Sequence, residues 1–225
     1  MTAGRTSGRV HWMVLDSATL RALLAQPSES PFDLRAVMGP EARDAAVLVP
    51  LTDSPDGLVV HVLVRSAALR DHAGEVGFPG GKVEAGESLE RALAREVEEE
   101  TGLGEGDVEV LGRLHAVPVV TGRYLIHPFV GLSRRAPQIT STEHARLYDL
   151  PLARWLEGRE PIEITEAPWR GLPLLVPHFR VGEHVMYGAS AAILFDLLSR
   201  LSPEPLPTTL VTNKPWGDRY RRHEG

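Results

Sequence analysis

The acidic residues between positions 96 and 100 are the part of this sequence best suited to chemistry. On a helical wheel that starts at Leu89, Glu96 and Glu100 fall inside the apolar arc, whereas Glu98 points the opposite way. Glu99 sits at the edge of that arc. Carboxylates this close would raise one another's pKa unless a cation neutralised them. Because every candidate ligand is oxygen, a hard divalent ion such as Mg²⁺ or Mn²⁺ is the favoured occupant.

A solvated acidic surface with Glu–Arg pairs is the alternative interpretation of this segment. Two observations favour the metal site. An ordinary surface helix keeps its acids off the apolar stripe, and here Glu96 and Glu100 lie on it. The helix is also preceded by a glycine-rich turn over Gly77–Gly81, which allows backbone to approach a ligand closely.

The spacing of these residues resembles the Nudix box at every defined position. The matching residues are Gly81, Glu87, Arg95, Glu96, Val97, Glu99, Glu100, Gly102 and Leu103. The resemblance implies a loop-helix-loop that binds divalent cations and hydrolyses nucleoside diphosphate derivatives. It makes Glu96, Glu99 and Glu100 the metal ligands, with the Gly81 carbonyl as an additional one. Glu87 and Arg95 are expected to join the loop to the helix through a carboxylate–guanidinium pair.

A second motif upstream resembles the coenzyme A diphosphatase branch of that family. Its fixed points are Arg65, Ser66, Arg70, Gly74 and the segment from Phe78 to Gly81. Arginine forks suit phosphate, and coenzyme A carries a diphosphate and a 3′-phosphate. The resulting candidates for substrate binding are Arg65, Ser66, Arg70, His72, Phe78 and Gly80. The alternative for Arg65 and Arg70 is that they are solvated surface charges at a strand end and in a loop. His72 is expected either to contact substrate or to cap the loop.

Weaker similarity continues beyond the box. Glu143 opens a segment that resembles a family element in which valine follows the acid, whereas His144 follows it here. Met186–Ala191 resembles another short element of the same branch, with Tyr187 in place of tryptophan. Glu99 and Glu143 remain alternative candidates for the catalytic base.

The resemblance implies hydrolysis of coenzyme A or its derivatives to 3′,5′-ADP and 4′-phosphopantetheine, or the acylated form. Hydrolysis of another nucleoside diphosphate, such as ADP-ribose or NADH, is the alternative. A non-hydrolytic ligand-binding regulator is a third possibility, which the complete set of box carboxylates disfavours.

Composition excludes several other functions. The 225 residues carry a formal charge of −6 and no cysteine, so nucleic-acid binding, disulfides and thiolate catalysis are not expected. The sequence shows neither a signal peptide nor an apolar run of membrane-spanning length, so a cytoplasmic protein without membrane partners is expected. It does not distinguish a monomer from a homodimer.

The expected fold is α+β, a Nudix-type α/β/α sandwich with a mixed β-sheet. We expect an N-terminal helix and linker over 1–42, a Nudix domain over 43–201 and a Pro-rich tail without regular structure over 202–225. The expected helices cover 17–25, 88–101 and 189–201, with helical turns across 143–157 and a linker over 27–40. The expected strands cover 45–51, 58–64, 108–120 and 124–132, followed by a hairpin over 174–186.

Overall fold

The computed structural model describes residues 17–25, 33–169 and 172–212. Its largest element is a mixed sheet with the strand order β3-β2-β1-β7-β5, to which β4, β6 and β8 add at β1, β7 and β2. The strands of this sheet are β1 (Arg43–Thr52), β2 (Val59–Arg65), β3 (Val76–Gly77), β4 (Gly80–Lys82), β5 (Val108–Arg113), β6 (Val117–Pro118), β7 (Tyr124–Ser133) and β8 (His144–Pro151). The long central strands β1 and β7 run parallel, whereas β1 and β2 form an antiparallel pair around the turn at 53–58.

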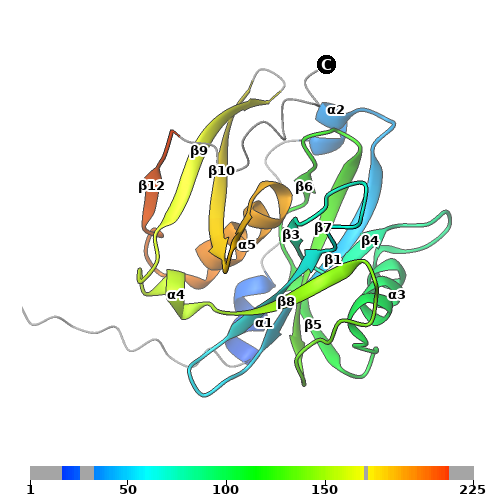
Figure 1. Cartoon of the computed structure of the whole chain (residues 1–225), viewed down its shortest axis with the longest axis horizontal. Helices are drawn as coiled ribbons and strands as arrows, with labels where there is room; N and C mark the ends of the chain where they lie inside the picture. Colours follow the sequence, from blue (N-terminus) through cyan, green and yellow to red (C-terminus); the bar gives the residue numbers. More distant parts are fainter. Residues whose placement is uncertain (1–16, 26–32, 170–171, 213–225) are drawn as a thin grey trace, which may run out of the picture.

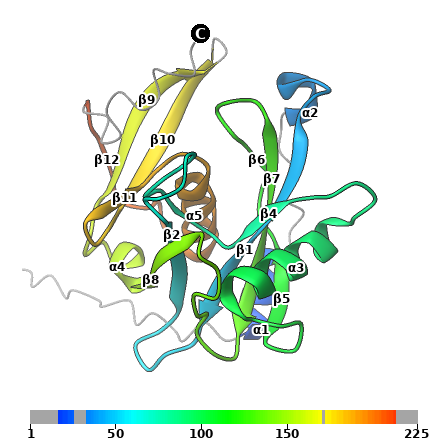
Figure 2. The same ribbon diagram turned by 45° about the vertical axis from the view of Figure 1, so that its right-hand side comes forward.

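A smaller second sheet has the order β11-β10-β9-β12. Its strands are β9 (Ile162–Trp169), β10 (Leu172–Val181), β11 (His184–Met186) and β12 (Thr208–Leu210). β10 and β11 form the expected hairpin, with Val181 opposite His184. β9 and β10 make a long antiparallel ribbon that stands beside the main sheet (Figures 1 and 2).

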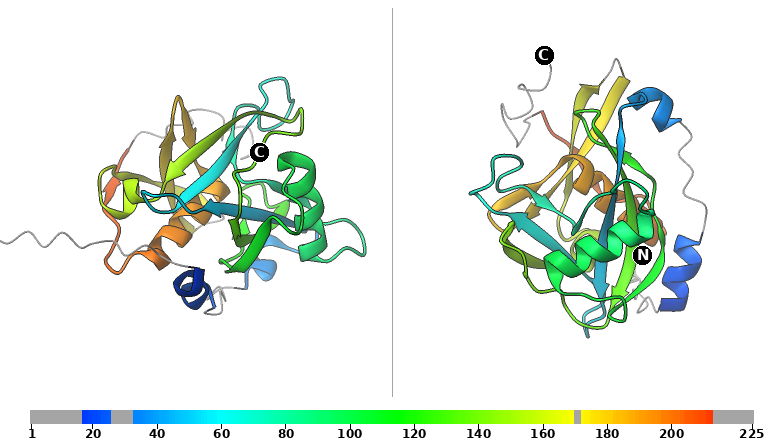
Figure 3. Two further views of the ribbon diagram at one scale, coloured as in Figure 1. Left: turned by 90° about the horizontal axis from the view of Figure 1, so that it is seen from below. Right: turned by 90° about the vertical axis from the view of Figure 1, so that its right-hand side faces the viewer.

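Helices cover both faces of the main sheet. The helices are α1 (Ser17–Leu24), α2 (Leu34–Met38), α3 (Leu89–Thr101), α4 (Ala153–Leu156) and α5 (Gly188–Leu201). α3 packs on one face, and α5 lies on the other, between the main sheet and the β9–β10 ribbon (Figure 1). Figure 3 shows α1 on the side of the molecule away from α3. This layering confirms the expected α+β sandwich.

The box helix forms where the sequence predicts it because its ends are encoded locally. The Ser88 side chain accepts a hydrogen bond from Arg91 N at 3.3 Å, and Gly102 ends the helix in the left-handed conformation with φ 66°. Leu93 and Val97 pack on Ala46, Leu48 and Phe129 of β1 and β7. The apolar arc of the wheel therefore faces the sheet.

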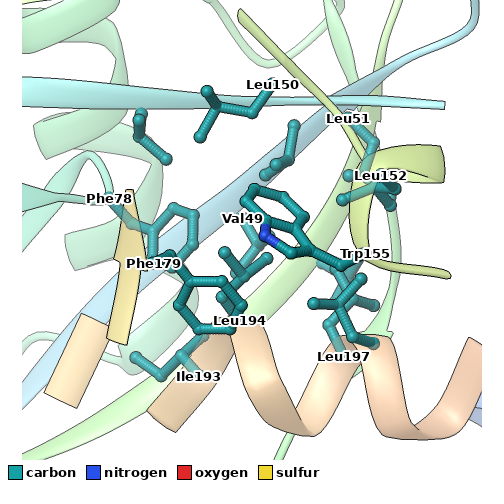
Figure 4. Packing of buried hydrophobic residues seen from close by; sticks show 14 of the residues in the cluster. Val49, Leu51, Phe78, Leu150, Leu152, Trp155, Phe179, Ile193, Leu194 and Leu197 are labelled. Carbon is teal, nitrogen blue, oxygen red and sulfur yellow. The ribbon is translucent and has the colours of Figure 1, made fainter. Parts of the chain in front are cut away.

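The larger core lies between the main sheet, α5 and the second sheet. Trp155 and Phe179 are 1% exposed and meet edge to face, with ring centroids 5.1 Å apart. Figure 4 shows both rings between Ile193 and Leu197 of α5 and Val49 and Leu51 of β1. Leu20 and Leu24 of α1 belong to the same core.

Several expected elements are wrong. The region 143–157 is mostly strand, because β8 pairs with β2 along its length and only α4 is helical. The strand expected over 108–120 is broken after β5, where His115 N donates to Asp196 Oδ2 of α5 at 3.0 Å instead of continuing the ladder. The sequence also missed β9.

The expected linker and tail also contain regular structure. Asp33 caps α2, accepting a hydrogen bond from Ala36 N at 3.1 Å, within the region expected to be linker. β12 lies in the region expected to be irregular and pairs in parallel with β9. Residues 26–32 of the expected linker and residues 213–225 of the expected tail lie outside the described part of the chain.

Within the described residues, no helix has the length and apolar character that a membrane span requires.

Candidate active site

Two adjacent glycines bring β4 against both the sheet and the box helix. At Gly80, with φ 140°, an added Cβ would lie 2.6 Å from Val47 Cα and closer still to the Ala46 carbonyl. At Gly81, an added Cβ would lie 2.5 Å from Oε1 of Glu96. At Gly80 the obstacle is backbone, so this position must be glycine, whereas a side chain at Gly81 would require the Glu96 carboxylate to move away. This close approach places backbone amide and carbonyl groups among the box carboxylates.

Glu100 is the buried carboxylate of the site. It is 7% exposed, and its Oε2 accepts a hydrogen bond from Gly80 N at 2.9 Å. The pKa of Glu100 is raised to about 7, chiefly by burial and also by the charges of Glu96 and Glu143, while the Gly80 N–H and the positive charge of Arg65 act to lower it. Glu96 and Glu100 of α3 and Glu143, just before β8, are therefore close enough for their negative charges to repel one another at a partly buried site.

The expected carboxylate–guanidinium pair is present. Arg95 donates from Nε and Nη2 to the two oxygens of Glu87, both at 3.1 Å, and from Nη1 to Glu96 Oε1 at 2.7 Å. Its Nη2 also donates to the Lys82 carbonyl at 3.2 Å. These bonds raise the pKa of Arg95 and lower that of Glu87. Arg95 therefore joins the loop before α3 to the helix and orients the Glu96 carboxylate.

The residues present fit a hard divalent cation by donor type. Glu96 and Glu100 both face Gly80–Gly81, and the mutual repulsion that raises the Glu100 pKa is what a cation would relieve. Among the described residues, no three His, Asp or Glu side chains are arranged closely enough to hold a metal ion without moving. Glu96 is instead paired with Arg95, and the Glu99 side chain is exposed.

Arg65 and Glu143 lie together at this site although they are 78 positions apart in sequence. Arg65 Nη2 donates to Glu143 Oε2 at 3.2 Å, and Ser66 N donates to the Glu143 carbonyl at 2.7 Å. Arg65 Nε is buried without a hydrogen-bond partner among the described residues, as is Nδ1 of the neighbouring His144. His144 Nε2 lies 3.8 Å from Glu100 Oε1, and burial lowers the His144 pKa.

The other substrate-motif residues are divided between loop and core. Arg70 is exposed in the loop between β2 and β3, and His72 in the same loop bonds Glu75 at 2.8 Å. The Ser66 hydroxyl accepts a hydrogen bond from Ala68 N at 3.3 Å and so shapes the loop's first turn. Phe78 is 8% exposed and packs its ring into the main core (Figure 4). The Phe78 ring therefore has a packing role.

Sequence reasoning missed the segment that completes the end of α3. Residues 135–140, which we call the capping segment, run past the last turn of the helix. Thr140 donates from Oγ1 to the Glu99 carbonyl at 2.7 Å and from N to the Glu100 carbonyl at 3.1 Å. Gln138 N donates to the Thr101 carbonyl at 3.0 Å, and Arg135 Nη2 to the Gly102 carbonyl at 2.5 Å. No local sequence signal could have paired these residues with a helix about 40 positions earlier.

Comparison with known proteins identifies the family of this chain. A profile of the NUDIX domain matches residues 42–161. The uncharacterized Nudix hydrolase NudL of Cronobacter sakazakii is 34% identical over 206 residues, which cover 86% of this chain and 97% of the relative. The peroxisomal coenzyme A diphosphatase ndx-8 of Caenorhabditis elegans is 42% identical over 121 residues, or 51% of each protein. The solved structure of a MutT protein from Methanosarcina mazei Go1 is 26% identical with a TM-score of 0.40, and the match covers 54% of this chain and 86% of that one.

The chain belongs to the Nudix hydrolase family, whose members act on diphosphate bonds of nucleoside diphosphate derivatives and generally use divalent metal ions. The resemblance to this family recognised in the sequence is confirmed, and the half-length match to ndx-8 supports the resemblance to the coenzyme A diphosphatase branch.

Proposed function

We propose that this hydrolase cleaves the diphosphate of coenzyme A and its derivatives, giving 3′,5′-ADP and 4′-phosphopantetheine or its acylated form. The observation that carries the proposal is the position of Arg65. This arginine opens the coenzyme A motif, its guanidinium donates a hydrogen bond to Glu143, and its positive charge lowers the pKa of the buried Glu100 carboxylate against the effect of burial. A motif arginine at the carboxylate cluster is well placed to meet the phosphate on which the cluster acts.

We propose Glu96, Glu99, Glu100 and the Gly81 carbonyl as the groups that hold Mg²⁺ or Mn²⁺. When bound, such an ion neutralises charge on the diphosphate and lowers the pKa of a coordinated water. Arg95 supports this arrangement by orienting Glu96, and Gly80 N does the same for Glu100. Which of the two metals acts is part of the experiment below.

Between the two candidates for the base, the geometry favours Glu143. The Glu143 carboxylate accepts a hydrogen bond from Arg65 at 3.2 Å, and its charge raises the pKa of the buried Glu100. The Glu143 side chain is 53% exposed, so its carboxylate can reach a water that the substrate brings near. Arg65 would hold Glu143 in place until phosphate competes for the guanidinium.

A product-resolved hydrolysis assay tests the function. Coenzyme A, an acyl-coenzyme A, dephospho-coenzyme A, ADP-ribose and NADH would be compared by kcat/KM with Mg²⁺ and with Mn²⁺. The expected result is highest kcat/KM for coenzyme A or its acyl form, with 3′,5′-ADP as a product. Higher kcat/KM for ADP-ribose or NADH would assign the site to another nucleoside diphosphate.

Arg70→Ala refines the substrate assignment. A charge-assisted phosphate contact is worth roughly 1.5–3 kcal/mol, so kcat/KM for coenzyme A should fall about ten- to a hundredfold. If Arg70 binds the 3′-phosphate, dephospho-coenzyme A should be a poor substrate and lose little further in the variant. If kcat/KM were unchanged for both substrates, Arg70 would be a solvated loop residue that does not contact phosphate.

A further inference from the structure

One carboxylate joins the substrate loop to the layer formed by α5. Glu75, just before β3, lies with Oε2 2.8 Å from His72 Nδ1. The hydroxyl of Tyr187, the residue before α5, donates to the other oxygen of Glu75 at 3.1 Å. Tyr187 and Glu75 are 112 positions apart, and Tyr187 stands where the resembling element carries tryptophan. The resulting chain of contacts runs from α5 through Glu75 to an exposed imidazole.

The backbone of His72 is held in an unfavourable conformation. With φ 59°, it is the only non-glycine residue at positive φ in the described ranges. Backbone hydrogen bonds over-determine the turn, since Glu75 N donates to the His72 carbonyl and Gly74 N to the Arg65 carbonyl, both at 3.1 Å. Such conformations persist where the surroundings enforce them, and they gather at ligand-binding sites.

The groups around His72 favour its charged form. The hydrogen bond to Glu75 raises the pKa of His72, burial lowers it, the charges of Glu75 and Asp71 raise it, and that of Arg65 lowers it. Tyr187 acts on the same Glu75 carboxylate from the opposite layer. Because Nδ1 is engaged by Glu75, the other ring nitrogen, Nε2, is the one left for a ligand. The imidazole is 55% exposed, so a ligand can reach it.

We propose that Glu75 and Tyr187 are positioning residues, which hold the His72 imidazolium toward an anionic part of the substrate remote from the bond that is cleaved. They should therefore govern substrate affinity more than the rate of cleavage. This inference rests on the proposed function in one respect: the substrate is taken to be a nucleoside diphosphate derivative with phosphate within reach of this loop. Affinity should also fall as pH rises through the titration of His72.

The first test uses the free protein and no substrate. Titration of the histidine ring nitrogens by NMR should show the His72 midpoint moving to lower pH in Glu75→Gln, and moving less in Tyr187→Phe, which removes only the hydroxyl. Glu105→Gln, in the exposed turn after α3, is the matched control and should leave the midpoint in place. An unmoved His72 midpoint in Glu75→Gln would overturn the positioning role whatever the substrate is.

The second test measures KM and kcat with whichever nucleoside diphosphate derivative the native enzyme cleaves best, so a wrong substrate assignment does not obscure the result. Glu75→Gln should raise KM about three- to tenfold and leave kcat within about twofold. His72→Asn should do the same, because asparagine tolerates the left-handed backbone but carries no charge. A fall in kcat with KM unchanged, or native kinetics in both variants, would contradict the inference.

Discussion

Gly80 and Gly81 illustrate how neighbouring residues of one type serve the site for different reasons. At Gly80 the obstacle to a side chain is backbone, the Ala46 carbonyl and Val47 Cα of the adjacent strand. At Gly81 it is the carboxylate end of Glu96, which can rotate away. The first glycine allows β4 to pair with β1, and the second leaves room for a functional side chain.

Alanine at the two positions should therefore separate stability from activity. Gly80→Ala combines a backbone collision with an unfavourable φ and should cost about 2–4 kcal/mol of unfolding free energy. Gly81→Ala should cost less than about 1 kcal/mol but reduce kcat at least tenfold, because Glu96 must leave its place. Chemical denaturation and kcat for both variants provide the measurement. An equal loss of stability in Gly80→Ala and Gly81→Ala would show that the Glu96 side chain cannot move away from residue 81.

Glu100→Gln tests the metal assignment at the same scale. The change keeps the side-chain size and removes the charge, so activity should fall at least about a hundredfold, corresponding to about 3 kcal/mol or more. Glu98→Gln, on the exposed side of α3, should be nearly silent. Turnover of Glu100→Gln near the native value at saturating Mg²⁺ would refute the role of Glu100.

At the scale of elements, the capping segment does what the end of an isolated helix cannot do. The last four carbonyls of a helix lack intrahelical partners. In α3, Thr140 and Gln138 supply partners for the carbonyls of Glu99, Glu100 and Thr101. The same segment leads directly into Glu143, so it fixes the distance between the helix carboxylates and the proposed base.

Thr140→Val should expose that coupling. It removes only the hydroxyl that bonds the Glu99 carbonyl, at a cost of about 1 kcal/mol of stability. We also expect kcat to fall about three- to tenfold, because Glu143 would be held less firmly in position relative to the carboxylates of α3. Thr140→Ser retains the hydroxyl and should behave as the native protein. Native kcat in Thr140→Val would leave the capping segment with a purely structural role.

The β9–β10 ribbon contains a buried histidine that should make stability depend on pH. His178 is 2% exposed, its Nε2 lies 2.9 Å from Thr165 Oγ1 of β9, and burial lowers its pKa to about 4. The unfolded chain, with an ordinary imidazole pKa of about 6.5, binds a proton below that pH while the folded protein does not. Stability from this residue is thus complete above pH about 6.5 and is lost as pH falls from there toward about 4.

His178→Gln should weaken this dependence. Relative to the native protein, the variant should lose less stability between pH 6.5 and 4, by up to about 3 kcal/mol. Denaturant midpoints measured across that range give the comparison. Parallel stability curves for the two proteins would mean that folding does not lower the pKa of His178.

At the scale of the whole molecule, the fold extends at both ends beyond the Nudix domain expected from sequence. Leu20 and Leu24 of α1 reach the main core, and Leu206 packs against it. β12 adds a parallel edge to β9, with Ile162 N donating to the Pro207 carbonyl at 3.2 Å and Val211 N to the Ile164 carbonyl at 2.8 Å. We therefore propose a folding unit that includes α1 and residues 202–212.

Two truncations test that unit. A chain ending at Leu201 should have a Tm several degrees below that of a chain ending at Thr212, because it loses the β12 ladder and the Leu206 contact, together worth about 2 kcal/mol. Turnover should differ little at temperatures where both are folded, since the candidate site lies before residue 145. Equal Tm values would restore the boundary at residue 201.

The sequence by itself determined the features that depend on neighbours along the chain. Ser88 and Gly102 delimit α3, the wheel predicts which of its acids face inward, and the turn at 53–57 predicts the β1–β2 pair. Caps, helical periodicity and tight turns act over a few residues, so they can be recognised without knowledge of the fold. The pairing of Glu87 with Arg95, which the resemblance to the Nudix box implied, also joins residues of one loop-helix-loop.

Only the tertiary structure decided which distant segments meet. Helical turns are expected over the β8 segment from its sequence, yet it is a strand, because it pairs with β2, about 80 positions earlier in the chain, and such pairing can override a local preference. Burial of Glu100 against Gly80 N, the Arg65–Glu143 pair and the Tyr187–Glu75–His72 contacts also depend on the layers coming together. The sequence therefore determined which groups could do the chemistry. The packing of α3, β4 and β8 on one side of the molecule and of α5 against the substrate loop decided the distances between those groups, because these distances depend on contacts between segments far apart in the sequence.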